Sequence, residues 1–409
     1  MYLFIILLIL IIDYIIELAV DLRTVKSLKR EVPSSFKDFY PQKKYEKSQN
    51  YTKDKIKFSI FTTSFNTLLM IIFILIGGFN IFDQFARGFG FSAKITGLIF
   101  SFSLVGASFL LSIPFSAYQN FVIEEKYGFN KMTAKIFITD LIKSALLSVI
   151  MGIPILYAVL TFFYKFPDFG WLYIWVFLTI VQIVLVYIAP RVIMPLFNKF
   201  SPLEDEELKE KIFKYAAEHN FKIKGIYKMD GSKRSSKANA YFTGLGSTKR
   251  IVLFDTLLQH HTNNEILTIL AHEMGHFKNK HILKNFLISF LNSGLMLFIL
   301  NLFLKNEQLF NAFKMENVSI YASLILFGFL YSPISTIISI LTNALSRKFE
   351  LEADRFAVET TNMKADFIKA LKRLSAKNLS NLTPPKIKII LKFSHPPVIK
   401  RIKNIEQMR

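Results

Sequence analysis

The sequence contains no cysteine, and acidic residues are few: 30 Asp and Glu stand against 51 Lys and Arg among 409 residues. Without cysteine the chain forms no disulfide bond and offers no thiolate, so a transition-metal site must use histidines and carboxylates. The formal net charge of +21 is compatible with nucleic-acid binding. We expect no nucleic-acid partner, however, because Lys and Arg also collect in the cytoplasmic loops of membrane proteins.

Apolar residues make up 52% of the chain, and Phe alone occurs 43 times. They concentrate in stretches long enough to cross a bilayer, which takes about 20 residues. Asp13 and Glu17 interrupt the first such stretch, and the last two could instead be buried core helices, although their Phe, Leu and Ile content favours the bilayer. The sequence therefore predicts a mainly α-helical, multi-pass membrane protein. The seven candidate spans lie at roughly 2–20, 60–82, 95–117, 141–163, 171–197, 283–304 and 318–342.

Basic residues alternate between the segments that connect these spans. Lys and Arg are dense from Arg23 to Lys57, sparse in 83–94, denser again in 119–140 and sparse in 164–170. Because basic loops remain in the cytoplasm, this alternation predicts an outside N-terminus, with 198–282 and the tail after 342 facing the cytoplasm. We interpret Arg23–Lys57 as a solvated loop whose basic side chains can contact membrane lipid.

The chain is expected to divide into two domains. Residues 1–197 form an N-terminal transmembrane domain with five spans, and residues 198–409 form a second domain that contains the other two. The polar stretch 198–282 reads as a small α+β unit, with a helix that starts within Ser201–Glu206. Its two strands are expected at Lys222–Met229 and Arg250–Phe254, with Asn239–Phe242 between them.

The segment His272–His276 reads His-Glu-Met-Gly-His. On a helix, residues four apart share one face, so His272 and His276 can offer nitrogens to one metal ion. Glu273 can then reach a water molecule at that ion and act as general base, as in the H-E-x-x-H pattern of zinc metalloproteases. Thr262 and Glu265 have the spacing of a capping box that begins such a helix.

A catalytic zinc needs a third protein ligand, which the remaining histidines and the carboxylates can supply. Glu350 is the best candidate, because Asp354 shares its helix face and can hydrogen-bond the outer nitrogen of a ligand histidine. Glu352 points elsewhere and is interpreted as a solvated charge. His281 lies on a different face from His276 and is not expected to be a ligand. We interpret His260 and His261, which precede the helix, as polar loop residues.

Further segments follow in a characteristic order along nearly the whole chain. With the His272–His276 motif, they resemble the type 1 CAAX prenyl proteases, which are integral membrane zinc metalloproteases. The segment before the zinc helix is short and lacks the acidic insertion of animal relatives, which suggests a microbial member. The segments that carry the resemblance are Phe121–Asn130, Gly231–Ser236, Asn239–Phe242, Arg250–Leu258, Ser346–Asp354 and Ser394–Pro397 with Arg401.

The resemblance implies a fold of about seven transmembrane helices that enclose a chamber, with a small α+β zinc metalloprotease domain. It also implies one Zn²⁺ per chain and a peptide or protein substrate, with or without a prenyl group. The implied metal ligands are His272, His276 and Glu350, with Asp354 supporting them and Glu273 as the base. The other implied site residues are His395 and Arg401 near the metal, and Asn239, Ala240 and Tyr241 on a strand that pairs with the substrate.

The sequence therefore predicts an integral membrane zinc metalloendopeptidase, located in the bacterial inner (cell) membrane or, in a eukaryote, in the endoplasmic-reticulum membrane. In the expected mechanism, zinc activates water, Glu273 accepts its proton, and His395 stabilises the oxyanion. The alternative within enzymes is a membrane quality-control protease. The alternatives outside enzymes are a membrane transporter or a scaffold, but neither requires a general base beside two metal ligands.

Overall fold

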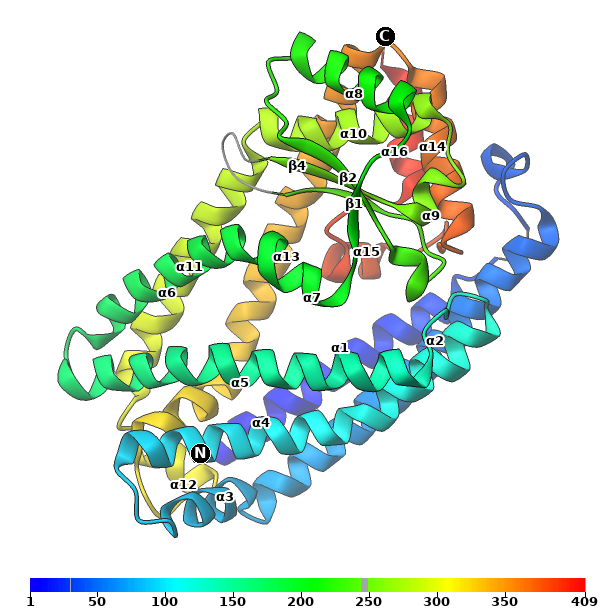
Figure 1. Cartoon of the computed structure of the whole chain (residues 1–409). Helices are drawn as coiled ribbons and strands as arrows, with labels where there is room; N and C mark the ends of the chain where they lie inside the picture. The colour runs from blue at the N-terminus through cyan, green and yellow to red at the C-terminus, as the bar shows by residue number, and fades with distance from the viewer. Residues whose placement is uncertain (30, 244–248, 409) are drawn as a thin grey trace.

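The computed structural model describes residues 1–29, 31–243 and 249–408. Seven of its helices are long and apolar enough to cross a membrane, which confirms the predicted mainly α-helical, multi-pass fold. In Figure 1 the sheet and several shorter helices gather at the upper end of the molecule, and the long helices extend from there to the lower end, where the short helices Gly78–Arg87 and Glu307–Ala312 lie. The seven spanning segments are Tyr2–Lys26, Gln42–Leu75, Ala93–Glu124, Ala134–Lys165, Gly170–Phe197, His281–Phe303 and Ile320–Thr361.

The first five segments belong to the N-terminal half. Several contain breaks in regular α-helical geometry, such as the π-helical turns η2 (Gln119–Glu124) and η3 (Ala189–Ile193). A short helix, α3, follows α2 and packs on α4. The α-helices of this half are α1 (Tyr2–Lys26), α2 (Gln42–Leu75), α3 (Gly78–Arg87), α4 (Ala93–Tyr118), α5 (Ala134–Lys165), α6 (Gly170–Ile188) and α7 (Met194–Phe197).

The second predicted span, 60–82, is displaced in the structure. Helix α2 begins eighteen residues earlier, at Gln42, and ends at Leu75. Gly77 then adopts φ +75°, a left-handed conformation that glycine tolerates, and the chain turns into α3. The prediction of a solvated loop over Arg23–Lys57 was therefore wrong: α1 continues to Lys26, and the first part of α2 packs on the polar unit through buried side chains such as Tyr45 and Tyr51.

The polar unit contains a four-stranded sheet with the order β1-β2-β4-β3. Strands β2 (Gly225–Met229) and β4 (Arg250–Phe254) pair in parallel, whereas β1 (Phe200–Pro202) and β3 (Ala240–Thr243) pair antiparallel at the two edges. Helix α8 (Glu206–Glu218) starts at the end of the predicted segment Ser201–Glu206, where Asp205 caps it by accepting a hydrogen bond from the Leu208 amide. Strand β1 takes up the beginning of that segment. Among the described residues, the outer position of β3 leaves one of its edges without a strand partner.

Helix α10 (Asn263–Lys278) carries the His-Glu-Met-Gly-His segment and packs on α13 (Ile320–Thr361). The predicted capping box is confirmed: Thr262 accepts from the Glu265 amide, and the Glu265 carboxylate accepts from the Thr262 amide. Helix α13 joins the seventh span and the Ser346–Asp354 segment into one continuous helix, with Pro333 inside it. The remaining helices are α9 (Asp255–Leu258), α11 (His281–Phe303), α12 (Glu307–Ala312), α14 (Lys364–Lys377), α15 (Lys386–Lys392) and α16 (Val398–Gln407).

Candidate metal centre

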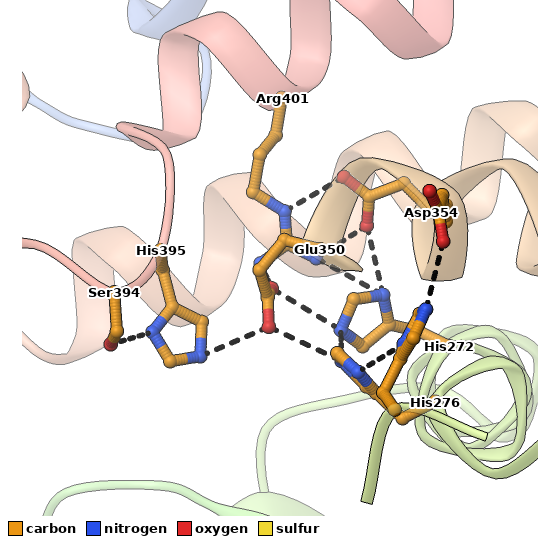
Figure 2. Close-up of polar contacts among 9 residues, drawn as sticks. His272, His276, Glu350, Asp354, Ser394, His395 and Arg401 are labelled. Carbon is orange, nitrogen blue, oxygen red and sulfur yellow. Dashed lines mark hydrogen bonds and ion pairs between the residues drawn. The ribbon is translucent and has the colours of Figure 1, made fainter. Parts of the chain in front are cut away.

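Three side chains from two helices meet where α10 crosses α13. One donor atom from each of His272, His276 and Glu350 lies within 4.8 Å of the others. The Nε2 atoms of His272 and His276 are 3.2 Å apart, and His276 Nε2 lies 3.2 Å from Glu350 Oε1. Figure 2 shows the three side chains converging on one point. Two imidazole nitrogens and one carboxylate oxygen are the protein ligands expected of a catalytic zinc site.

The donor set fits a tetrahedral metal ion in both distance and chemistry. Two nitrogens bound to one tetrahedral zinc at about 2.0–2.1 Å lie about 3.3 Å apart, close to the observed 3.2 Å between His272 and His276. Glu350 is buried, and its Oε2 atom has no hydrogen-bond partner among the described residues; its ion-pair neighbours His272 and Arg401 are 3.5 Å away. A buried carboxylate oxygen without a close donor is costly unless a cation binds there.

Asp354 and Arg401 hold His272 from behind the metal centre. Asp354, which is fully buried, lies 2.9 Å from His272 Nδ1 and accepts two hydrogen bonds from Arg401, at 2.6 and 2.9 Å. A proton on Nδ1 leaves the Nε2 lone pair free for the metal. Burial lowers the pKa of the Arg401 guanidinium, but the charge and hydrogen bonds of Asp354 together with the charges of Glu350 and Glu273 outweigh this and raise it, so Arg401 remains a cation.

The same surroundings favour the cationic form of His272 when no metal is bound. Burial and the charge of Arg401 lower the pKa of His272, but its contacts with the carboxylates of Asp354 and Glu350 and the charge of Asp354 together outweigh them and raise it to about 9. A metal ion at Nε2 therefore replaces a proton, as is usual for histidine ligands.

His395 reaches the centre from the loop between α15 and α16. Its Nε2 lies 3.2 Å from Glu350 Oε1, and its Nδ1 lies 2.9 Å from Ser394 Oγ (Figure 2). The side chain is 65% exposed, so a substrate can approach it. Arg347 of α13 holds this loop by donating to the carbonyl of Phe393, at 2.7 Å, which directly precedes Ser394.

Two residues that the sequence analysis set aside lie behind His276. His276 Nδ1 is 3.0 Å from His281 Nδ1, and His281 Nε2 is 2.9 Å from Glu352 Oε2. If Nε2 of His276 faces the metal, its Nδ1–H donates to His281, whose Nε2–H then donates to Glu352. The interpretation of Glu352 as a merely solvated charge was therefore wrong. His281 stacks on the Phe349 ring, with 4.2 Å between the ring centroids, which fixes its orientation.

The two histidines that precede α10 lie outside the centre. His261 lies between α9 and α10, as expected for a loop residue, but it is buried, and its Nδ1 lies 3.2 Å from the carbonyl oxygen of Leu257. His260 Nε2 lies 2.7 Å from Lys377 Nζ. Neither belongs to the group of donors that could hold a metal.

Glu273 follows His272 on α10 and is partly buried. In the described part of the chain its carboxylate has no hydrogen bond and no ion pair, but its negative charge is among those that raise the pKa of Arg401. The other predicted site residues, Asn239, Ala240 and Tyr241, lie at the start of β3, where the Asn239 carbonyl accepts from the Phe254 amide at 3.1 Å and Ala240 pairs with Leu253. They share a sheet edge, and the structure gives no direct bond between them and the three metal donors.

The fold and this donor set define a membrane-embedded metallopeptidase. Residues 21–199 match the family model described as CAAX prenyl protease N-terminal, five membrane helices, and residues 202–409 match peptidase family M48. The chain belongs to the CAAX prenyl protease family of membrane zinc metalloendopeptidases. The enzyme interpretation is thereby confirmed over the transporter and scaffold alternatives.

Curated relatives cover almost the whole chain. The CAAX prenyl protease 1 homolog of Arabidopsis thaliana is 37% identical over 97% of this chain and 95% of its own. CAAX prenyl protease 1 of Saccharomyces cerevisiae is 36% identical over 92% of this chain and 89% of its own. Among solved structures, the crystal structure of S. mikatae Ste24p superposes with a TM-score of 0.94 at 35% identity and covers 99% of both chains.

Proposed function

We propose that this enzyme holds one Zn²⁺ on His272, His276 and Glu350 and uses it to hydrolyse a peptide bond. The observation that carries the proposal is the convergence of their three donor atoms within 4.8 Å, with a Glu350 Oε2 atom that accepts no hydrogen bond from the described residues. Zinc supplies Lewis-acid chemistry there: it lowers the pKa of water and polarises the scissile carbonyl.

Each side chain around the three metal ligands has its own role in the proposed reaction. Glu273, whose carboxylate is unpaired in the described chain, accepts a proton from the attacking water and delivers it to the leaving amine. His395, exposed beside Glu350, donates to the oxyanion that develops on the substrate. Asp354 and Arg401 keep His272 in the tautomer and orientation that a metal ligand needs.

We further propose that the substrate is a protein whose C-terminal CAAX segment carries a prenyl group on its cysteine, and that cleavage after this cysteine releases three residues. The names of the relatives support this substrate class. The peptide adds to the free edge of the sheet along Asn239, Ala240 and Tyr241. Main-chain pairing of this kind fixes the register of the peptide without requiring one particular sequence.

The division into a transmembrane domain, 1–197, and a metalloprotease domain, 198–409, remains our proposal, as does its orientation. The density of basic residues from Arg23 to Lys57 supports a cytoplasmic catalytic side. These side chains then lie at the membrane surface, where they can contact anionic lipid headgroups.

The deciding experiment compares wild type with Glu273→Ala, each purified in detergent and quantified for zinc. Both are assayed on a farnesylated CAAX peptide and on the same peptide without the lipid. We expect about one zinc per chain in both proteins and cleavage by wild type alone, because general acid–base catalysis contributes about 10²–10⁴-fold in rate.

The outcomes separate the parts of the proposal. Zinc in both proteins with cleavage of the farnesylated peptide alone supports a prenylated substrate, whereas equal cleavage of both peptides makes the lipid dispensable. Undiminished cleavage by Glu273→Ala would remove Glu273 from its role. Absence of zinc from both proteins would overturn the metal site.

A further inference from the structure

The free edge of the sheet is closed immediately before the proposed substrate residues. The side-chain amide of Asn378 bonds both backbone groups of Ala238: it accepts from the Ala238 amide at 3.1 Å and donates to the Ala238 carbonyl at 3.2 Å. Asn378 therefore occupies the main-chain positions that a paired peptide would need at Ala238. A peptide lying along Asn239, Ala240 and Tyr241 cannot continue its pairing past this point.

Charged side chains lie directly beyond the closed end. Lys237, which precedes Ala238, donates to Glu124 Oε2 at 2.8 Å and to the Tyr51 hydroxyl at 2.9 Å. Tyr51 in turn donates to Glu124 Oε1 at 2.6 Å. These contacts join the start of β3 to α2 and to the π-helical turn η2, so residues of the membrane half stand at the end of the proposed substrate strand.

Lys55 adds a second lysine to this cluster. It follows Tyr51 by one helical turn, and its ammonium lies 5.2 Å from the centre of the Tyr51 ring. Within the described residues Lys55 forms no ion pair, although its charge interacts with those of Lys237, Glu124 and Lys388. Two lysines therefore face one glutamate at the end of the strand, and the local charge is positive.

Lys55 also faces an open space. It lines a cavity of about 850 Å³ whose other walls are mostly apolar, with Phe73 and Leu111 among them and a few polar side chains such as Asn66. Lys57, two residues further along α2, lines a separate cavity with Asp54 and Lys126. The two lysines are thus close in sequence and lie on different sides of the helix.

The direction of a bound peptide determines which of its ends reaches Lys55. Antiparallel pairing is the slightly more stable arrangement, and it places the C-terminal side of the peptide at the N-terminal end of β3. Three extended residues span about 10 Å, and Lys237 lies three residues before Ala240. With the scissile bond placed opposite Ala240, a leaving group of three residues ends where the edge is closed and the positive charge lies.

We propose that Lys55, supported by the Lys237–Glu124–Tyr51 network, binds the free α-carboxylate at the C-terminus of the peptide substrate. This inference rests on the proposed function, since it assumes that the peptide pairs with β3. It explains two features that the chemistry at the metal does not use: the closure of the strand edge by Asn378 and the second lysine beyond it.

Two peptides of the same farnesylated sequence test the inference, one with a free C-terminal carboxylate and the other with a C-terminal amide. Binding is measured by fluorescence anisotropy to full-length Glu273→Ala, which leaves the peptides uncut. We expect the carboxylate peptide to bind about 10- to 100-fold more tightly, because hydrogen bonds to charged groups are the stronger ones. Adding Lys55→Met should weaken binding of the carboxylate peptide to the level of the amide and leave the amide unchanged.

The matched controls are Lys55→Arg, which keeps a cation at the position, and Lys57→Met, which removes one from the other side of α2. Both should retain the preference for the carboxylate. Equal affinity of Glu273→Ala for the two peptides would overturn the inference. It would also be overturned if adding Lys55→Met lowered the affinity for the carboxylate peptide and for the amide peptide by the same factor. Cleavage by wild type is read separately: failure to cut either peptide would refute the proposed hydrolysis, whereas cleavage without a carboxylate preference would refute the role of Lys55 alone.

Discussion

Gly275 of α10 lies against the backbone of Ala353 in α13, so closely that a Cβ atom at Gly275 would stand 3.0 Å from Ala353 Cα and 3.1 Å from its carbonyl oxygen. Gly275 directly precedes His276, and Ala353 directly precedes Asp354. The absence of a side chain at this crossing therefore sets the distance between the histidines of one helix and the carboxylates of the other.

Gly275→Ala should accordingly weaken the metal centre. Alanine favours a helix over glycine by about 1 kcal/mol, but the added methyl group has only backbone atoms and the Phe356 Cβ to displace, and overpacking costs about 1–3 kcal/mol. We expect zinc affinity and activity to fall together. Gly328→Ala in α13, where a Cβ meets nothing within 4 Å, is the control, and wild-type zinc affinity in Gly275→Ala would contradict the argument.

Those features of the metal centre that depend on residues close to one another in the sequence could be predicted. The capping box of Thr262 and Glu265 and the i, i+4 pair of His272 and His276 follow from helix geometry alone. The seven spans follow from apolar length, although the start of α2 at Gln42 does not, because a polar helical segment that packs on the sheet domain has no apolar run to reveal it.

The contact of His281 with His276 could not be predicted from the sequence, because it depends on the turn between α10 and α11. Helix α10 ends at Lys278, Lys280 adopts φ +57°, and α11 starts at His281. Extending the periodicity of α10 past its end places His281 on the wrong face. In the sequence, the end of α10 is indicated only by Asn279 and by the apolar run that follows it. Neither feature predicts the distance between His281 and His276.

His281→Ala should lower zinc affinity without removing a ligand. It removes the acceptor of His276 Nδ1–H, 3.0 Å away, and outer partners of this kind are worth about 10–100-fold in metal affinity. Glu352→Gln should act in the same direction, because Glu352 holds His281. Competition with a fluorescent chelator measures the effect, with His260→Ala as the control; an unchanged affinity in His281→Ala would show that His276 needs no such support.

Arg401→Met should destabilise the fold as well as the centre. The substitution leaves the carboxylate of Asp354 fully buried without its cation. Removing one partner of a buried ion pair lowers the free energy of unfolding by about 3–5 kcal/mol. Arg401→Lys should restore part of the loss, because lysine keeps the charge but not the two parallel hydrogen bonds. The double variant Arg401→Met/Asp354→Leu should regain thermal stability while zinc affinity stays low. Equal melting temperatures of wild type and Arg401→Met would contradict this account.

His395→Ala separates catalysis from metal binding. His395 lies 3.2 Å from Glu350 Oε1 but is largely exposed, so its loss should leave the three metal donors in place. If His395 donates to the developing oxyanion, kcat should fall about 10²–10³-fold with zinc content unchanged. Ser394→Ala, which removes only the contact to His395 Nδ1, should have a smaller effect because the imidazole remains. Zinc loss in proportion to activity in His395→Ala would instead identify His395 as a support of the metal site, since an oxyanion donor acts only on the reacting substrate and not on the resting centre.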